Sequence, residues 1–257
     1  MKVRHLDSVC VVGQDDRARN MATSLGRGYP VCTPMEAHDR PLAVVGSGPS
    51  VRDYLEEIRA VKEVWAINGA YDYMVDVGIV PTGFFALDPL PGLVDYVRNP
   101  RHETTYYLAS TVDSSVLDAL DGFRIRLWHT NAEDMTYPSG AWSMRGGTTA
   151  ITRAPYLGYC LGHRDITLYG ADSSFEGNRY CYDDGTYECD SQAPRMKFTC
   201  NGEGPFDTEL CLLKQVSQLG VIVDLFKGML KIKCGGLMDA YMRAPVRDDS
   251  DIELATL

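Results

Sequence analysis

The residues best suited to ligand chemistry form a short glycine-rich loop, Gly46-Ser47-Gly48-Pro49-Ser50. Glycine lets the backbone approach a ligand closely, and proline suits the first helical position because it has no N–H to leave unpaired. The amide hydrogens of the first helical turn and the Ser50 hydroxyl would then point at an anion. Val51 breaks the GxGxxG pattern, and no Gly-Lys-Ser/Thr sequence follows. The loop predicts a phosphate or ribose site, with a tight strand-to-helix turn as the alternative.

Three further polar residues stand where apolar segments end. Asn68 follows Glu63–Ile67, about 20 residues beyond the loop, where dinucleotide-binding folds place a residue that reads a ribose. Its amide could contact a ribose or base, or cap the following helix. Asp88 and Asp172 each end an apolar segment. Their carboxylates could hold Mg²⁺ between phosphates, orient a sugar hydroxyl or cap a turn.

A second glycine-rich segment, Arg145-Gly146-Gly147-Thr148-Thr149, opens a predicted helix. An arginine beside amides at a helix N-terminus predicts a second anion site, the alternative being an N-cap with an exposed arginine. The stretch 172–204 has the length of a functional lid. Tyr180 within it could stack on a base or hydrogen-bond a leaving phosphate, or pack the loop onto its own domain.

The elements that would position these residues alternate between strands and helices. This alternation predicts an α/β fold, a Rossmann-like, mostly parallel sheet with helices on both faces, in which ligands bind beyond the carboxyl ends of the strands. We expect an N-terminal extension over 1–40 with a short helix near Arg17–Leu25, a nucleotide-binding domain over 41–235, and an acidic tail over 236–257. Strands are expected at 42–45, 63–67, 82–87, 104–109, 123–128, 165–169 and 221–225, and helices at 51–60, 70–77, 114–120, 148–161 and 207–219.

Composition excludes several classes of protein. The net charge is −10, and no basic stripe is present, so nucleic acid is not an expected partner. Apolar stretches such as Gly220–Phe226 are far shorter than the roughly 20 residues that a bilayer requires. The first residues also lack the apolar core of a signal peptide. None of the eight cysteines forms a CxxC pair. We therefore expect a cytoplasmic protein with reduced thiols, no membrane contact and no metal site.

Four segments of the chain carry a resemblance to a known family. They are Ala43–Ser50, Ala66–Asn68, Ala86–Pro89 and Gly147–Ala171. Taken in order, they resemble the archaeal 6-hydroxymethylpterin diphosphokinase-like (MptE-like) family, and the last segment, with Ile166–Asp172 at its end, is the most specific. The resemblance covers about residues 41–235, and the same layout looks like the bacterial sialyltransferases that use CMP-sialic acid.

The sialyltransferase resemblance implies that Ser47, Asn68 and Asp88 lie near the phosphate and ribose of a nucleotide. It also implies that Arg145 and Thr148 hold the cytidine or phosphate side, and that Tyr180 stabilises the leaving phosphate. Those transferases use a histidine base before the last long helix, whereas this chain has no histidine after His163. The diphosphokinase resemblance instead implies diphosphate transfer from ATP, helped by Mg²⁺ on carboxylates such as Asp88 and Asp172.

We therefore expect a transferase that binds a small-molecule nucleotide donor of the CMP- or UDP-sugar type and transfers the glycosyl group. Asp172 and Tyr180 are the expected catalytic residues. Mg-ATP-dependent diphosphate transfer and a non-catalytic nucleotide-binding or assembly role are the alternatives. A side chain at Gly48 is expected to abolish binding while sparing the fold. The acceptor and the oligomeric state, a homo-oligomer included, stay open.

Overall fold

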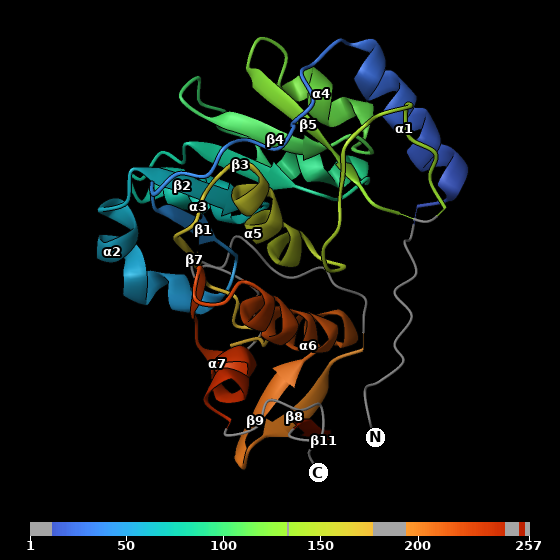
Figure 1. Cartoon of the computed structure of the whole chain (residues 1–257). Coiled ribbons are helices and arrows are strands. Elements are labelled where there is room, and N and C mark those ends of the chain that lie inside the picture. Colours follow the sequence, from blue (N-terminus) through green and yellow to red (C-terminus); the bar gives the residue numbers. More distant parts are fainter. Residues whose placement is uncertain (1–11, 133, 177–193, 245–251, 255–257) are drawn as a thin grey trace.

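The computed structural model describes residues 12–132, 134–176, 194–244 and the strand 252–254. Its centre is an eight-stranded sheet with helices around it, the predicted α/β fold (Figure 1). All paired strands of this sheet run parallel. Leu42–Val45 is buried at every residue, as expected for a strand covered on both faces.

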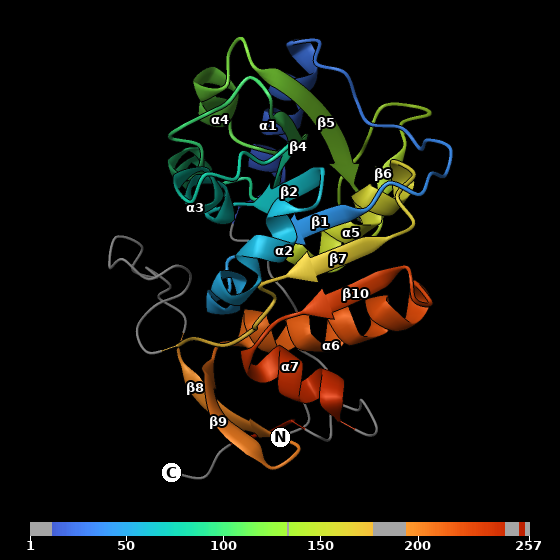
Figure 2. The ribbon, with the colours of Figure 1, turned by 90° about the vertical axis from the view of Figure 1, so that its left-hand side faces the viewer.

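The strand order of the large sheet is β10-β7-β1-β2-β3-β4-β5-β6. Successive strands β2 to β5 are therefore added on one side of β1, whereas β7 and β10 are added on the other (Figure 2). The strand order reverses between β1 and β7, where open α/β sheets bind ligands. The strands are β1 Leu42–Val45, β2 Glu63–Ile67, β3 Gly83–Ala86, β4 Thr105–Ala109, β5 Arg124–Thr130, β6 Ser143–Met144, β7 Ile166–Tyr169 and β10 Leu230–Lys233.

The helices largely follow the predicted segments, with one change of type. The segment after the glycine-rich loop begins as a 3₁₀ helix, η1, and becomes α-helical only at Leu55. The predicted short helix near Arg17–Leu25 is confirmed as α1. The helical elements are α1 Gln14–Gly26, η1 Pro49–Tyr54, α2 Leu55–Arg59, α3 Ala70–Asp76, η2 Pro91–Tyr96, α4 Ser114–Ala119, α5 Ala150–Cys160, α6 Leu210–Leu225 and α7 Gly236–Arg243.

The predicted strand at 221–225 is wrong, because these residues continue α6. Ile222 and Phe226 are 3% and 5% exposed, whereas Val221 and Leu225 are 59% and 61% exposed. Burial that repeats every four residues is helical, and this period was hidden by a continuous apolar run. The strand that joins the sheet here is β10, a few residues later.

A smaller antiparallel sheet lies beyond α6 and α7 (Figure 1). It consists of β8 Met196–Cys200, β9 Glu203–Thr208 and β11 Ile252–Leu254, in the order β11-β8-β9. The segment 236–257 thus contributes a helix and a strand to the structure. Within the described ranges, no helix combines the length and apolarity needed to cross a membrane.

Candidate functional site

Asp172 and the glycine-rich loop meet at the point where the strand order reverses. The loop follows β1 and Asp172 follows β7, and these strands are neighbours. The Asp172 carboxylate accepts hydrogen bonds from the Ser50 amide at 2.9 Å, from the Ser50 hydroxyl at 2.5 Å and from the Gly235 amide at 3.0 Å. We call Ser50, Asp172 and Gly235 the Asp172 cluster. The carboxylate occupies the position at the start of η1 where a bound anion was expected.

Two further amides of the loop, and that of Val51 after it, are also used within the protein. The N–H groups of Gly46 and Gly48 donate to the carbonyls of Tyr169 and Gly170 at 2.8 and 2.9 Å, and the Val51 N–H donates to Gly48. The expectation that first-turn amide hydrogens point at a ligand therefore fails for Ser50 and Val51. The Ser47 hydroxyl has no hydrogen bond to any described residue, so Ser47 is the member of the loop left available to a ligand.

The glycines are needed for packing within the chain. A Cβ at Gly48 would lie 2.6 Å from both Asp172 Cγ and the Gly170 oxygen. A Cβ at Gly46 would lie 2.8 Å from the same oxygen and would overlap Ile151. Such distances require the neighbouring chain to move. The expectation that a side chain at Gly48 spares the fold is therefore revised: the conflict is with Asp172 before any ligand is present.

Asn68, at the carboxyl end of β2, carries a polar atom without a partner. Its side-chain oxygen is buried and has no hydrogen bond within the described structure. Its backbone adopts a φ of 47°, a conformation in which asparagine is enriched. A Cβ built on the next residue, Gly69, would lie 4.0 Å from Ser47 Oγ, which places the Ser47 hydroxyl close to this turn. Buried polar atoms are nearly always hydrogen-bonded, so this one calls for an explanation.

Asp88 follows β3, next to β2 in the sheet. Burial raises the pKa of its carboxyl group, and the Leu90 amide, donating at 3.0 Å, partly offsets this effect. The N-terminal helix α1 reaches the same region, because Asn20 donates to the carbonyls of Pro89 and Thr111. The residue pattern of α1 does not indicate that this helix supports the loop after β3. We call Ser47, Asn68 and Asp88 the β1–β3 edge.

The second predicted anion segment is tied to α6. The Thr148 amide and hydroxyl both donate to Gln218 Oε1, at 2.9 and 3.1 Å. A Cβ at Gly147 would lie 2.5 Å from the same oxygen. The side-chain amide of Gln218 thus occupies the position before α5 where an anion was expected.

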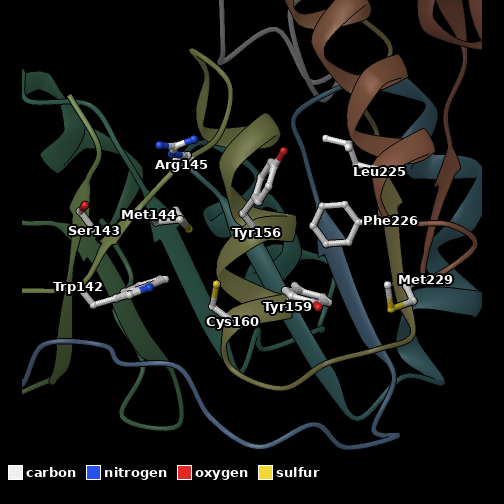
Figure 3. A pocket seen from close by; sticks show the side chains of 10 residues that line it. All are labelled: Trp142, Ser143, Met144, Arg145, Tyr156, Tyr159, Cys160, Leu225, Phe226 and Met229. Atoms are coloured by element: carbon white, nitrogen blue, oxygen red, sulfur yellow. The ribbon is translucent and has the colours of Figure 1, made fainter. Parts of the chain in front are cut away.

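Arg145 lies apart from the β1–β3 edge, in a cavity of about 390 Å³ flanked by α5 and the end of α6. Figure 3 shows Trp142 and Met144 on one side of this cavity, Leu225, Phe226 and Met229 on the other, and Tyr156, Tyr159 and Cys160 projecting from α5 between them. Most of the side chains that line the cavity are apolar or aromatic, and Arg145 is the charged residue among them.

A buried histidine lies near the carboxyl end of β5. His129 is 1% exposed, and its Nδ1 lies 2.8 Å from Ser110 Oγ. Burial lowers the pKa of this imidazole, which favours its neutral form. His163 lies at the opposite edge of the sheet, just before β7, between the Arg40 carbonyl at 3.0 Å and Glu63 at 3.2 Å.

Tyr180 lies outside the described residues. Among the residues whose placement is described, no group of three or more His, Cys, Asp or Glu side chains is arranged to hold a metal ion.

The comparisons with known proteins agree with this architecture. A family model described as 6-hydroxymethylpterin diphosphokinase MptE-like matches residues 19–178, more than half of the chain. The MAf glycosyltransferase from Magnetospirillum magneticum AMB-1 superposes with a TM-score of 0.65 at 16% identity. That match covers 96% of this chain but 43% of the MAf protein. A mammalian sialyltransferase superposes with a TM-score of 0.45 at 14% identity, over 91% of this chain and 83% of its own. No curated protein matches the sequence. At 16% identity, the similarity to the MAf protein concerns the fold alone.

Proposed function

This chain belongs to the 6-hydroxymethylpterin diphosphokinase MptE-like family, and we propose that it is a transferase that binds a nucleotide or nucleotide-sugar donor at the β1–β3 edge and transfers the glycosyl group. The solved neighbour with the higher TM-score is named a glycosyltransferase. This neighbour supports glycosyl transfer as the first candidate. The chain spans less than half of that neighbour's length, so its activity is part of the proposal.

The observation that carries the proposal is the unpartnered side-chain oxygen of Asn68. A ribose hydroxyl or the amino group of a base can donate to this oxygen, while the Ser47 hydroxyl can serve the neighbouring hydroxyl or phosphate. Both residues follow adjacent strands at the carboxyl edge, beside the point where the strand order reverses. A bound nucleotide would supply the hydrogen bond that the buried oxygen lacks.

Asp88 is the group we assign to proton transfer. A carboxylate whose pKa is raised by burial is a stronger base than an exposed one. In glycosyl transfer, Asp88 would accept the proton of the acceptor hydroxyl while the hydroxyl oxygen bonds to the anomeric carbon of the donor. The bond between that carbon and the donor phosphate breaks, and its electron pair stays on the phosphate. Asp172 is instead a positioning residue, because its oxygens already accept three hydrogen bonds from the chain.

The family description supports a second candidate, diphosphate transfer from ATP to a hydroxymethyl group. In that reaction Asp88 would hold Mg²⁺, and catalysis would consist mainly of positioning and charge neutralisation. The two candidates differ in the nucleotide and in the need for metal.

Thermal unfolding in the presence of CMP, UDP or ATP, with and without Mg²⁺, separates these functions. A ligand at 100 times its dissociation constant should stabilise the protein by about 2.7 kcal/mol. Stabilisation by CMP or UDP without metal supports the glycosyltransferase, and stabilisation by ATP only with Mg²⁺ supports the kinase. If no nucleotide changes the melting temperature, the proposal fails and an assembly role becomes the better explanation.

Two matched variants test whether the nucleotide binds at the β1–β3 edge. Asn68→Gly removes the amide but keeps a backbone that tolerates positive φ. Asn201→Gly makes the same change at another asparagine of positive φ, 50°, in the turn between β8 and β9. Loss of nucleotide stabilisation in Asn68→Gly alone would support the β1–β3 edge, whereas equal responses of both variants would exclude it.

A further inference from the structure

The cavity beside α5 has the size and the lining of a small-molecule site. Its volume is about 390 Å³, within the range of about 300 to 1,000 Å³ that is usual for such sites. Trp142 bounds it on one side and Phe226 on the other, and Tyr156 and Tyr159 project from α5 between them (Figure 3). Aromatic side chains from three segments of the chain thus surround one hollow.

The rings beside α6 are held in place by their contacts with one another. The Phe226 ring meets Tyr156 and Tyr159 nearly edge to face, with ring centroids 5.1 and 5.3 Å apart and interplanar angles of 78° and 86°. Such arrangements are favourable for aromatic pairs. Trp142, by contrast, has no hydrogen bond or ring contact with any residue that the structure describes. Its indole is therefore available to a flat ligand.

Arg145 gives the cavity a positive charge. Its guanidinium forms no hydrogen bond or ion pair within the described part of the chain. A second guanidinium, that of Arg164, lies over the Tyr159 ring at 3.9 Å from the centroid. The described residues that line the cavity include no aspartate or glutamate, although the chain carries 35 acidic residues. The charges around the cavity therefore suit an anion.

The backbone on both sides of Arg145 is held against α5. A Cβ at Gly146 would lie 2.9 Å from Arg153 Cγ and 3.4 Å from Tyr156 Cδ2, so this close approach requires glycine. On the other side, the Met144 carbonyl accepts a hydrogen bond from Arg153 Nη1 at 3.2 Å. The backbone of Arg145 is thus positioned by its neighbours, while its side chain has no partner and can reach a ligand.

The cavity is separate from the β1–β3 edge. Phe226 and Met229 precede β10, and the Met229 carbonyl accepts from the Ile166 amide, at the start of β7, at 2.8 Å. This wall of the cavity therefore lies toward the amino ends of the parallel strands. Asn68 and Asp88 instead follow the carboxyl ends of β2 and β3. Binding in the cavity thus does not depend on the nucleotide site.

We propose that this cavity binds a small aromatic anion, a ligand that combines a flat apolar ring system with one carboxylate or other oxyanion group. The ring system would stack on Trp142 and pack against the tyrosines of α5. The oxyanion would accept hydrogen bonds from the Arg145 guanidinium. A rigid ring loses little conformational entropy on binding, and the aromatic lining offers it both faces and edges.

The test uses the full chain, with 2-naphthoate as the probe and the uncharged 2-naphthamide for comparison. Calorimetric titration of the wild type is expected to show saturable binding of 2-naphthoate. Arg145→Gln should weaken this binding about tenfold or more, the effect of losing a charge-assisted hydrogen bond, and should leave 2-naphthamide binding unchanged. Arg101→Gln is the matched control, because Arg101 is also exposed and its guanidinium has no described partner. This variant should bind 2-naphthoate like the wild type.

A second pair of variants tests the wall formed by α6. Leu225 and Val221 lie four residues apart on α6 and are 61% and 59% exposed, so a substitution at either position should preserve the fold. Leu225 lines the cavity, whereas Val221 is not among its lining residues. Leu225→Glu should therefore weaken 2-naphthoate binding more than Val221→Glu, because its carboxylate would lie beside the bound anion.

Four results would overturn the proposal. The first two are a wild type without saturable binding and equal affinities of Arg145→Gln and the wild type for 2-naphthoate. Competition between CMP and 2-naphthoate would assign the cavity to the nucleotide instead. Light scattering supplies the fourth result, since an oligomer that Leu225→Glu dissociates would show that a second copy of the chain covers the cavity.

Discussion

The carboxylate of Asp172 accepts two hydrogen bonds from Ser50, one from its amide at 2.9 Å and one from its hydroxyl at 2.5 Å. The two residues are 122 positions apart in the chain. Their contact fills the start of η1 with a charge that belongs to the protein. The consequences can be measured by mutation.

Asp172→Asn should destabilise the protein by about 2–3 kcal/mol, because hydrogen bonds to a charged acceptor are lost and an amide nitrogen faces buried donors. Urea unfolding measures the change. Ser50→Ala removes the hydroxyl bond alone and should cost about 1 kcal/mol. Equal stabilities of Asp172→Asn and the wild type would mean that Asp172 is free to react with a substrate.

Gly48→Ala should cost about 1–3 kcal/mol, the usual penalty for overpacking, since its Cβ would lie 2.6 Å from Asp172 Cγ. Gly92→Ala is the control, because a Cβ there meets nothing within 4 Å; its effect should stay within about 0.5 kcal/mol. Comparable unfolding midpoints for the two variants would contradict the described packing of the loop.

Gln218→Glu should stabilise the protein by about 0.3–1 kcal/mol at low salt, because a negative charge would lie near the N-terminus of α5. Gln218→Ala should instead cost about 1 kcal/mol, since Thr148 loses its acceptor. Thermal unfolding at low and high ionic strength measures the stability change of each variant and its dependence on salt. A gain that persisted in high salt would argue against the electrostatic cause.

The pH dependence of stability should contain a contribution from His129. Burial holds the folded pKa of His129 below the ordinary value of a histidine, so the unfolded chain binds the proton first as the pH falls. The contribution of neutral His129 to the free energy of unfolding is therefore fully present above about pH 6.5, and it is lost as the pH drops toward the folded pKa. His129→Gln should make the slope of unfolding free energy against pH shallower between pH 7 and 5. Identical slopes in the two proteins would contradict this assignment.

The periodicity of the sequence was sufficient to predict the α/β fold, since strands such as Leu42–Val45 and Glu63–Ile67 were recognised at their observed bounds. The segment 221–225 was misassigned because continuous apolar sequence carries no visible period. Strand order could not be predicted either. It depends on pairings such as β1 with β7, which residue spacing does not reveal.

For the site, the sequence identified Asn68 and Asp88 as strand-end polar residues. It did not predict that Asp172 would accept from the amide and hydroxyl of Ser50, or that Gln218 would accept from Thr148. Both contacts join residues far apart in the chain. The cavity beside Arg145 could not be predicted, because Trp142, Tyr156 and Phe226 come together only in the folded structure.

The Asp172 cluster also affects the order in which the protein can be completed on the ribosome. The Gly235 donor lies 63 residues after Asp172, beyond the end of the family match at residue 178. Until β10 has been synthesised, β7 is an edge strand, open to pairing with other chains. A nascent chain paused between β7 and β10 would be prone to aggregation. The last quarter of the sequence therefore supplies the strand that covers the edge of β7.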